Sequence, residues 1–204
     1  LSSADGTESN GFLRLGDAEF VKIGTSGWAV SGGTLSNNGS NNNNTGEGAL
    51  GRMIPVDGLS ANEGNLLTLS FDYSLNDPGE VLYVHLWGLS GTASDNSLVM
   101  NLGAQNGNAW YYSNAGIEMV NLADGVSTNG AASAAAVSLT GTTGARTYSG
   151  TIDLSGYSEA PNDLSGYDYI ALGFARQIHG TSTPGVSVSN ITLSVNSKGE
   201  EEVP

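Results

Sequence analysis

The chain has 204 residues, including 30 glycines and no cysteine, and its formal net charge is −14. This acidity argues against binding to nucleic acid or to an anionic membrane surface, because both would repel the protein. The absence of cysteine excludes a disulfide framework, a zinc–thiolate site and a thiol nucleophile. The sequence has no apolar run of about 18 residues, so we expect no insertion into a membrane.

Composition predicts one all-β domain rather than a disordered or helical chain. Hydrophobic residues make up 38% of the sequence, which is enough for a packed core. We expect a flexible segment over residues 1–11, a single β domain over residues 12–196 and a linker over residues 197–204. We further expect this linker to continue in a larger exported protein, either secreted or held at the cell surface.

The first part of the chain predicts short strands joined by turns. Residues 12–23 form a first strand pair, and residues 28–35 form a strand, a tight turn at Gly32-Gly33 and a second strand. We assign Trp28 to the core. Residues 36–48, rich in Asn and Gly, form a loop before a short strand at residues 49–56.

The strongest strand signals come from two neighbouring segments. Residues 66–75 alternate apolar side chains with polar ones, and the polar ones are Thr68, Ser70, Asp72 and Ser74. Residues 80–89 form the next strand, after a turn at residues 76–79. The short connection predicts that the two strands pair as an antiparallel hairpin.

The remaining strands are shorter until the last third of the chain. We expect them at residues 97–102, 109–113, 116–122 and 146–154. Residues 168–179 then alternate large apolar residues with small ones, and residues 185–195 change parity at Ser189-Asn190, which predicts a β-bulge. Many short strands without an amphipathic helix predict a β-sandwich, a jelly roll of two antiparallel sheets.

Residues 81–89 carry the chemistry that is most typical of a binding surface. A period of two places Tyr83, His85 and Trp87 on the face opposite the apolar residues of this strand. Rings with polar tips stack on the apolar faces of sugars and bond their hydroxyl groups. The same pattern also fits a strand buried on both faces, so accessible rings favour sugar binding and covered rings favour a scaffold.

A groove would form if residues 168–179 lay in the same sheet as the ring-bearing strand. Gln177 and His179 would then join the three rings, and small residues of this strand would leave room for a ligand. Asp72 and Trp110 are further candidate contacts. We therefore predict non-catalytic polysaccharide binding by an extracellular domain. The first alternative is a structural or adhesive domain without a small ligand.

The second alternative is a polysaccharide lyase. Gln177-Ile178-His179 resembles a tripeptide of the jelly-roll alginate lyases, which use a His base and an Arg or Gln that neutralises the uronate carboxylate. Arg176 could supply that cation. The other motif strands of those lyases are missing, and no two carboxylates share a predicted strand at the i, i+2 spacing that would suggest a glycosidase pair. We therefore predict no catalytic residue.

Three segments resemble bacterial carbohydrate-binding modules of the galactose-binding-like jelly-roll type. Residues 11–20, followed by Gly27-Trp28-Ala29-Val30-Ser31-Gly32-Gly33, resemble the opening strand and turn of these modules. Residues 66–73 resemble their next long strand, and residues 186–193 resemble their closing strand. The resemblance implies a jelly-roll fold and polysaccharide binding.

The resemblance also implies a structural calcium ion, held between an N-terminal Glu and an Asp of the closing strand. In this sequence Ser189 stands where that Asp would be, and the Glu is displaced to Glu19. Asp17 and Glu19, with nearby carbonyl oxygens, offer the oxygen ligands that Ca²⁺ prefers. The predicted metal site is therefore Asp17 and Glu19, and we expect no other cofactor.

Overall fold

The structure is a computed structural model that describes most of the chain between Phe12 and Asn196. The described residues are 12–14, 21–23, 28–37, 47–59, 64–91, 100–101, 111–112, 117–127, 135–140, 143–178 and 185–196. The expected terminal segments, residues 1–11 and 197–204, lie outside these ranges. The domain boundaries therefore stay predictions.

Two antiparallel sheets contain nearly all the strands. The first sheet has the order β13 (Gly144–Asp153), β6 (Leu66–Leu75), β15 (Val186–Asn196), β4 (Thr34–Asn37) and β3 (Trp28–Ser31), with β1 (Phe12–Arg14) beside β15. The second has the order β11 (Val126–Ser127), β10 (Ile117–Asn121), β7 (Glu80–Gly91), β14 (Tyr169–Ile178), β5 (Glu47–Pro55) and β2 (Val21–Ile23), with β12 (Val137–Thr140) beside β7. A separate pair joins β8 (Met100–Asn101) to β9 (Tyr111–Tyr112).

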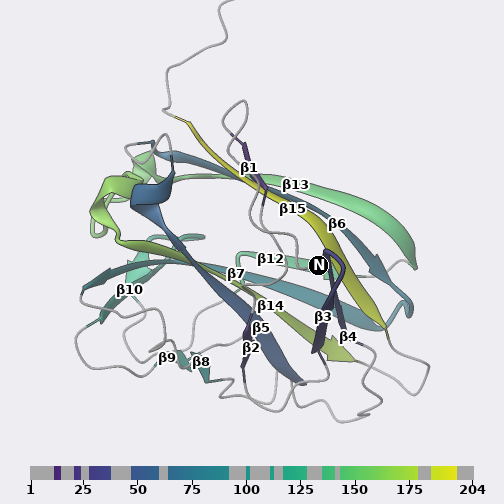
Figure 1. Ribbon diagram of the computed structural model, residues 1–204. Helices are drawn as coiled ribbons and strands as arrows, with labels where there is room; N and C mark the ends of the chain where they lie inside the picture. The colour runs from purple at the N-terminus through teal and green to yellow at the C-terminus, as the bar shows by residue number, and fades with distance from the viewer. Residues whose placement is uncertain are drawn as a thin grey trace, which may run out of the picture.

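The two sheets stack as the layers of a sandwich, with β13, β6 and β15 in one layer and β7, β14 and β5 in the other (Figure 1). Apolar residues of both sheets meet between the layers in one buried cluster. At its centre the rings of Phe71 and Phe174 pack edge to face, with centroids 5.5 Å apart. The predicted all-β jelly-roll sandwich of two antiparallel sheets is confirmed.

The predicted hairpin between residues 66–75 and 80–89 is wrong. Strand β6 pairs with β13 and β15, whereas β7 pairs with β14, β10 and β12, so the turn between them crosses from one sheet to the other. Each strand has one apolar face, and these faces meet across the sandwich instead of lying side by side in one sheet. Sequence alternation identifies an apolar face but not the layer that it covers.

Other local predictions are confirmed. Strands β3 and β4 form a hairpin whose turn residues Gly32 and Gly33 have φ values of 60° and 83°, a conformation that glycine adopts without a steric cost. Trp28 is 1% exposed and belongs to the core. The pairing of β15 with β6 shifts between Ser189 and Thr192, and Asn190 has a φ of 50°, as a β-bulge predicts.

A buried ion pair in the second sheet, near the start of β7, is hydrogen-bonded to the first sheet. Arg176 of β14 lies 3.4 Å from Glu80, measured from Nε to Oε1, and its Nη1 donates to the main-chain oxygen and side-chain Oδ1 of Asn37 in β4. Glu80 accepts hydrogen bonds from the backbone N–H groups of Asn76, Asp77 and Gly185. The carboxylate therefore fixes the crossing turn and the entry into β15 together.

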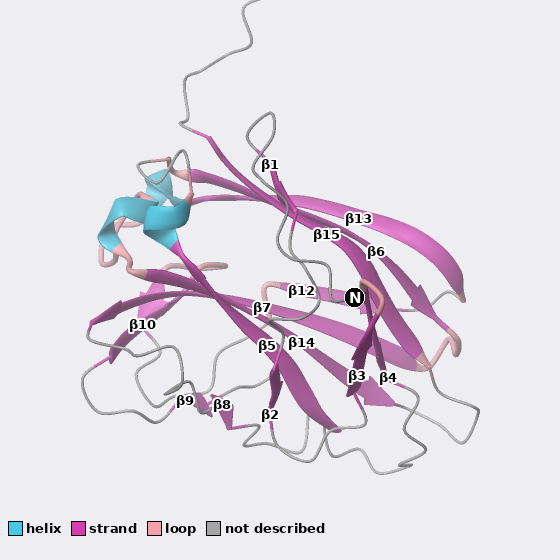
Figure 2. Cartoon of the chain, in the orientation of Figure 1, coloured by secondary structure: helices cyan, strands magenta, loops and turns pink. Residues whose placement is uncertain are grey.

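A five-residue sequence occurs twice and forms two of the 3₁₀ helices. The sequence Asp-Leu-Ser-Gly-Tyr occurs at residues 153–157 and 163–167, where it forms the 3₁₀ helices η2 (Leu154–Gly156) and η3 (Leu164–Gly166). In both copies the aspartate accepts a hydrogen bond from the serine N–H, and the leucine is fully buried. Figure 2 shows the helices, including η1 (Val56–Gly58), at one end of the sandwich.

Candidate ligand-binding faces of the two sheets

The ring-bearing strand β7 and strand β14 are neighbours in the second sheet. Their register places Tyr83 opposite Ala175, His85 opposite Gly173 and Trp87 opposite Ala171. The sequence-based assumption that these outward faces belong to one sheet is therefore confirmed. Gln177 pairs with Val81, which places it at a register position on the same face, although its side chain lies outside the described part.

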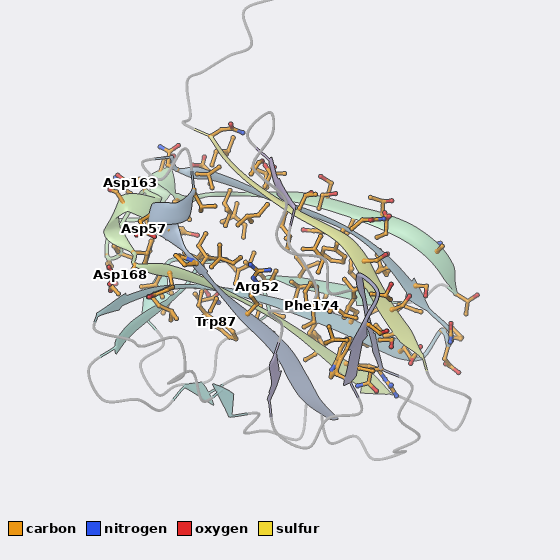
Figure 3. The ribbon with its side chains drawn as sticks, in the orientation of Figure 1. Arg52, Asp57, Trp87, Asp163, Asp168 and Phe174 are labelled. Atoms are coloured by element: carbon orange, nitrogen blue, oxygen red, sulfur yellow. The ribbon has the colours of Figure 1, made fainter. Side chains whose placement is uncertain are left out.

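The expectation of an open ring face is wrong for two of the three rings. His85 is 0% exposed and Trp87 is 1% exposed, although neither belongs to the core between the sheets. Figure 3 shows Trp87 on the side of the second sheet that faces away from the first, whereas Phe174 lies between the two layers. Strand β7 is thus buried on both faces at these positions, which is the alternative that the sequence left open.

The two buried rings form a stacked pair. Their centroids lie 5.2 Å apart with an interplanar angle of 18°. Burial lowers the pKa of His85 to about 3, because the charged imidazolium loses its hydration. At neutral pH the pair is therefore an uncharged aromatic unit that fills space beside the small residues of β14.

Tyr83 is the accessible end of this ring row. Its side chain is half-buried, and this partial burial raises the pKa of the phenol. On one side it pairs with the small Ala175, and on the other with Ser138 of β12, whose side chain is exposed. Thr140, two residues further along β12, is exposed as well. The geometry at this end is a single ring with exposed hydroxyl groups on its β12 side and a buried alanine on its β14 side.

Asp72 does not join the rings, so its predicted place in the groove is wrong. It lies on β6, where its parity points it away from the core on the outer face of the first sheet. Its Oδ1 accepts a hydrogen bond of 2.6 Å from the Thr147 hydroxyl, and its Oδ2 accepts one of 2.7 Å from the Asn190 amide. These two hydrogen bonds lower the pKa of Asp72, so the carboxylate is ionised at neutral pH.

Hydroxyl side chains surround Asp72 in register across five strands. We call this set the hydroxyl face, and it comprises Ser31, Thr34, Ser36, Thr68, Ser70, Ser74, Thr147, Ser149, Thr151, Ser187, Ser189 and Thr192, together with the buried Ser194. Some of them bond across strands, such as Ser74 with Ser187 at 2.7 Å and Thr68 with Thr151 at 3.1 Å. The alternation in β6 signalled one row of this face, but only strand pairing shows the full array.

Arg176 does not share a face with the predicted lyase residues. Its parity in β14 is opposite to that of Gln177, and it is buried between the sheets in the ion pair with Glu80. A guanidinium held there cannot neutralise a uronate bound on the outer face. The expected lyase arrangement therefore lacks its cation.

The remaining predicted site residues lie outside the described ranges. These are His179, Trp110, Asp17 and Glu19. Within those ranges, no group of three or more His, Cys, Asp or Glu side chains could hold a metal ion. The calcium site at Asp17 and Glu19 therefore stays a prediction.

Among the helices that the structure describes, none has the length and hydropathy needed to cross a membrane.

No protein-family model matches the sequence, and no curated protein matches it. A protein from Bacteroides thetaiotaomicron VPI-5482 with a proposed sugar-binding role is similar over 94% of this chain and 86% of its own, at 12% identity and a TM-score of 0.42. The family 11 carbohydrate-binding module of a Clostridium thermocellum cellulosomal cellulase is similar over 95% and 100%, at 14% identity and a TM-score of 0.40.

An enzyme domain is similar to the same extent. The xyloglucanase domain of NopAA, a type three effector from Sinorhizobium fredii, is similar over 95% of this chain and 99% of its own, at 13% identity and a TM-score of 0.37. Similarities of this size do not assign a function, which has to be argued from the residues of this chain.

Proposed function

We propose that the chain is a non-catalytic carbohydrate-binding domain whose polysaccharide ligand meets the Tyr83 end of the ring row. The observation that carries this proposal is a half-buried tyrosine ring on the outer face of the second sheet, with the exposed hydroxyl groups of Ser138 and Thr140 on the neighbouring strand β12. We place the domain in a larger secreted or cell-surface protein.

The chemistry of this end suits a sugar. The apolar face of a pyranose stacks on a phenol ring, while the tyrosine hydroxyl, Ser138 and Thr140 can each donate and accept a hydrogen bond. Ala175, on the β14 side of the ring, is fully buried, so the ligand approaches from the β12 side. One ring supports weak binding per sugar, and repeated contacts along a polymer raise the overall affinity.

His85 and Trp87 have a supporting role in this proposal. Because both are buried, they make no contact with a ligand at the surface. Their stacked rings pack on the same face of β7 as Tyr83 and thereby fix the position of that strand. A neutral histidine is needed there, since an imidazolium would be buried without hydration.

Non-catalytic binding is favoured over hydrolysis by the residues of this face. The outer-face side chains that the structure describes on β7, β12 and β14 include no carboxylate, whereas a glycosidase needs two. Glu80 has the opposite parity and lies in the buried ion pair. We expect incubation with neutral polysaccharides and with alginate to release neither reducing ends nor unsaturated products.

The test is binding to soluble neutral polysaccharides by affinity gel electrophoresis. Tyr83→Ala should abolish the retardation of the protein, and Tyr83→Phe should retain part of it, because the ring remains. Tyr148→Ala removes another half-buried tyrosine, on the first sheet, and serves as the matched control. Unchanged retardation of a folded Tyr83→Ala variant would contradict the proposed site.

A structural or adhesive domain without a small ligand is the second candidate. It is favoured by the burial of His85 and Trp87, which removes two of the three rings from the surface. This candidate predicts no retardation by any soluble polysaccharide and no loss of a surface-attachment function in Tyr83→Ala. The same gels therefore separate the two candidates.

A further inference from the structure

The outer face of the first sheet differs from the surface expected of so acidic a chain. The formal net charge is −14, yet the hydroxyl face consists of Ser and Thr side chains around one central carboxylate, Asp72. At the margins of this face, the outer positions of β3, β6, β13 and β15 include Ala29, Leu66, Ala145, Asp153 and Asn196. On β1, Arg14 pairs with Thr192 and so holds a register position at the edge of the same face.

Strand pairing turns these side chains into a regular grid. One row across the sheet runs Thr147, Asp72, Ser189, Thr34 and Ser31, and the next contains Ser149, Ser70 and Thr192. Neighbouring strands lie about 4.8 Å apart, and alternate residues along a strand lie about 6.7 Å apart. The hydroxyl groups are thus held at fixed intervals rather than on mobile loops.

Asp72 has the chemistry to anchor a diol at the centre of this grid. Its two oxygens each accept one described hydrogen bond, from Thr147 and from Asn190, which fixes the orientation of the carboxylate. A carboxylate has about four acceptor positions, so this anchored group can accept further bonds from a pair of vicinal hydroxyls. Hydrogen bonds to a charged acceptor are the stronger class.

The backbone at Asn190 supports the same arrangement. Asn190 adopts a φ of 50° at the β-bulge of β15, a conformation uncommon for a residue other than glycine. The bulge adds a residue to the strand and re-aims this side chain, whose amide then reaches Asp72. Backbone geometry and side-chain contacts therefore both serve to hold the carboxylate on the exposed face.

From this geometry we infer that the hydroxyl face is a second carbohydrate-binding surface, selective for neutral polysaccharides and anchored by Asp72. The inference takes its ligand class from the proposed function but concerns the opposite face of the sandwich. Hydroxyl groups both donate and accept, so they match the hydroxyls of a neutral sugar. An ionised carboxylate at the centre of this face disfavours uronates and sulfated sugars.

A second copy of the chain is a poorer occupant of this face. A two-fold contact centred on the grid would bring two ionised Asp72 carboxylates together between two strongly acidic protomers. Both effects oppose association. A neutral polymer avoids this repulsion, because it brings no charge to the surface.

The test is an NMR titration of the ¹⁵N-labelled chain with cellohexaose and with mannohexaose, with an alginate hexasaccharide as the anionic comparison. We expect a neutral hexasaccharide to shift backbone amide signals around Asp72, Thr147 and Asn190, and the alginate oligomer to leave them in place. Asp72→Asn should weaken the binding that these signals report by at least tenfold. The matched control is Asp57→Asn, at an exposed aspartate among the 3₁₀ helices.

A second pair of variants guards against a local folding defect at Asp72. Ser149→Lys places a bulky cation on the hydroxyl face, and Ser158→Lys places the same group on an exposed position elsewhere. Only the first should abolish the shifts. Retained binding in both Asp72→Asn and Ser149→Lys would overturn the inference.

The pattern of shifts separates this inference from the proposed function. Shifts confined to the surroundings of Tyr83 would overturn the second surface and leave the proposed function standing. Shifts on neither face would overturn both. Signals near Asp72 that move on dilution of the protein rather than on addition of sugar would indicate self-association, which also overturns the inference.

Discussion

At the scale of single residues, His85 makes the folded state sensitive to acid. Its pKa is lowered to about 3 by burial, whereas an unfolded histidine titrates near 6.5. Between these values the unfolded chain binds the extra proton, so the free energy of unfolding falls as the pH falls. Lowering the pH from 7 to 5 should cost about 2 kcal/mol through this residue.

Urea unfolding at pH 7 and pH 5 measures this effect. In His85→Gln the difference between the two pH values should shrink by about 2 kcal/mol, because the titrating group is gone. The change His179→Gln serves as the comparison at the other histidine of the chain. An equal pH dependence in wild type and His85→Gln would show that His85 is hydrated.

Trp87 gives a second prediction at this scale. Because the ring is 1% exposed, Trp87→Ala should lower the free energy of unfolding by about 3–5 kcal/mol. Tyr83→Ala should cost clearly less, since its ring is half-buried. Denaturant curves of the two variants provide the comparison. A smaller loss of unfolding free energy in Trp87→Ala than in Tyr83→Ala would place the tryptophan at the surface. It would then again be a candidate for contact with the ligand.

At the scale of elements, the buried ion pair between β7 and β14 stabilises the crossing between the sheets. Glu80→Ala would leave the Arg176 guanidinium buried and would remove the acceptor of three backbone N–H groups. We expect a loss of about 3–5 kcal/mol, the range for breaking a buried pair from one side.

A double-mutant cycle tests the coupling of this pair. Glu80→Ala combined with Arg176→Met should cost less than the sum of the two single changes, since the second change removes the uncompensated charge. The measurement is the free energy of unfolding of all four proteins. Strict additivity would mean that the two side chains are not coupled.

The strands and turns also show which parts of the fold the sequence can predict. Alternation identified β6, β7, β14 and β15, and the glycine pair identified the β3–β4 turn, because these signals are local. The sheet that each strand joins depends on contacts between distant residues, so β6 and β7 were paired wrongly. The burial of Arg176 was equally hidden, since its partners Glu80 and Asn37 come from other strands.

At the scale of the whole molecule, the sandwich separates two kinds of chemistry. The second sheet carries the ring row, with Tyr83 at its accessible end, and the first sheet carries the hydroxyl face around Asp72. Sequence analysis found the ring row and, of the first sheet, placed only Asp72 in the same groove, because period-two patterns do not distinguish the two outer faces of a sandwich.

Several acidic side chains lie at one end of the molecule. Asp57, Asp163 and Asp168 lie at the end of the sandwich that carries the 3₁₀ helices (Figure 3). The predicted calcium ion belongs to Asp17 and Glu19, outside the described ranges. If it is structural, a chelator should lower the melting temperature of the chain, and added Ca²⁺ should restore it. An unchanged melting temperature would argue against the ion.

Binding of the full chain to a broad glycan array, measured with calcium and then with a chelator, decides whether the chain is a carbohydrate-binding domain. We predict a clustered set of neutral glycans among the hits and their loss in Tyr83→Ala. A blank array from protein that unfolds cooperatively would contradict carbohydrate binding and favour the structural or adhesive domain.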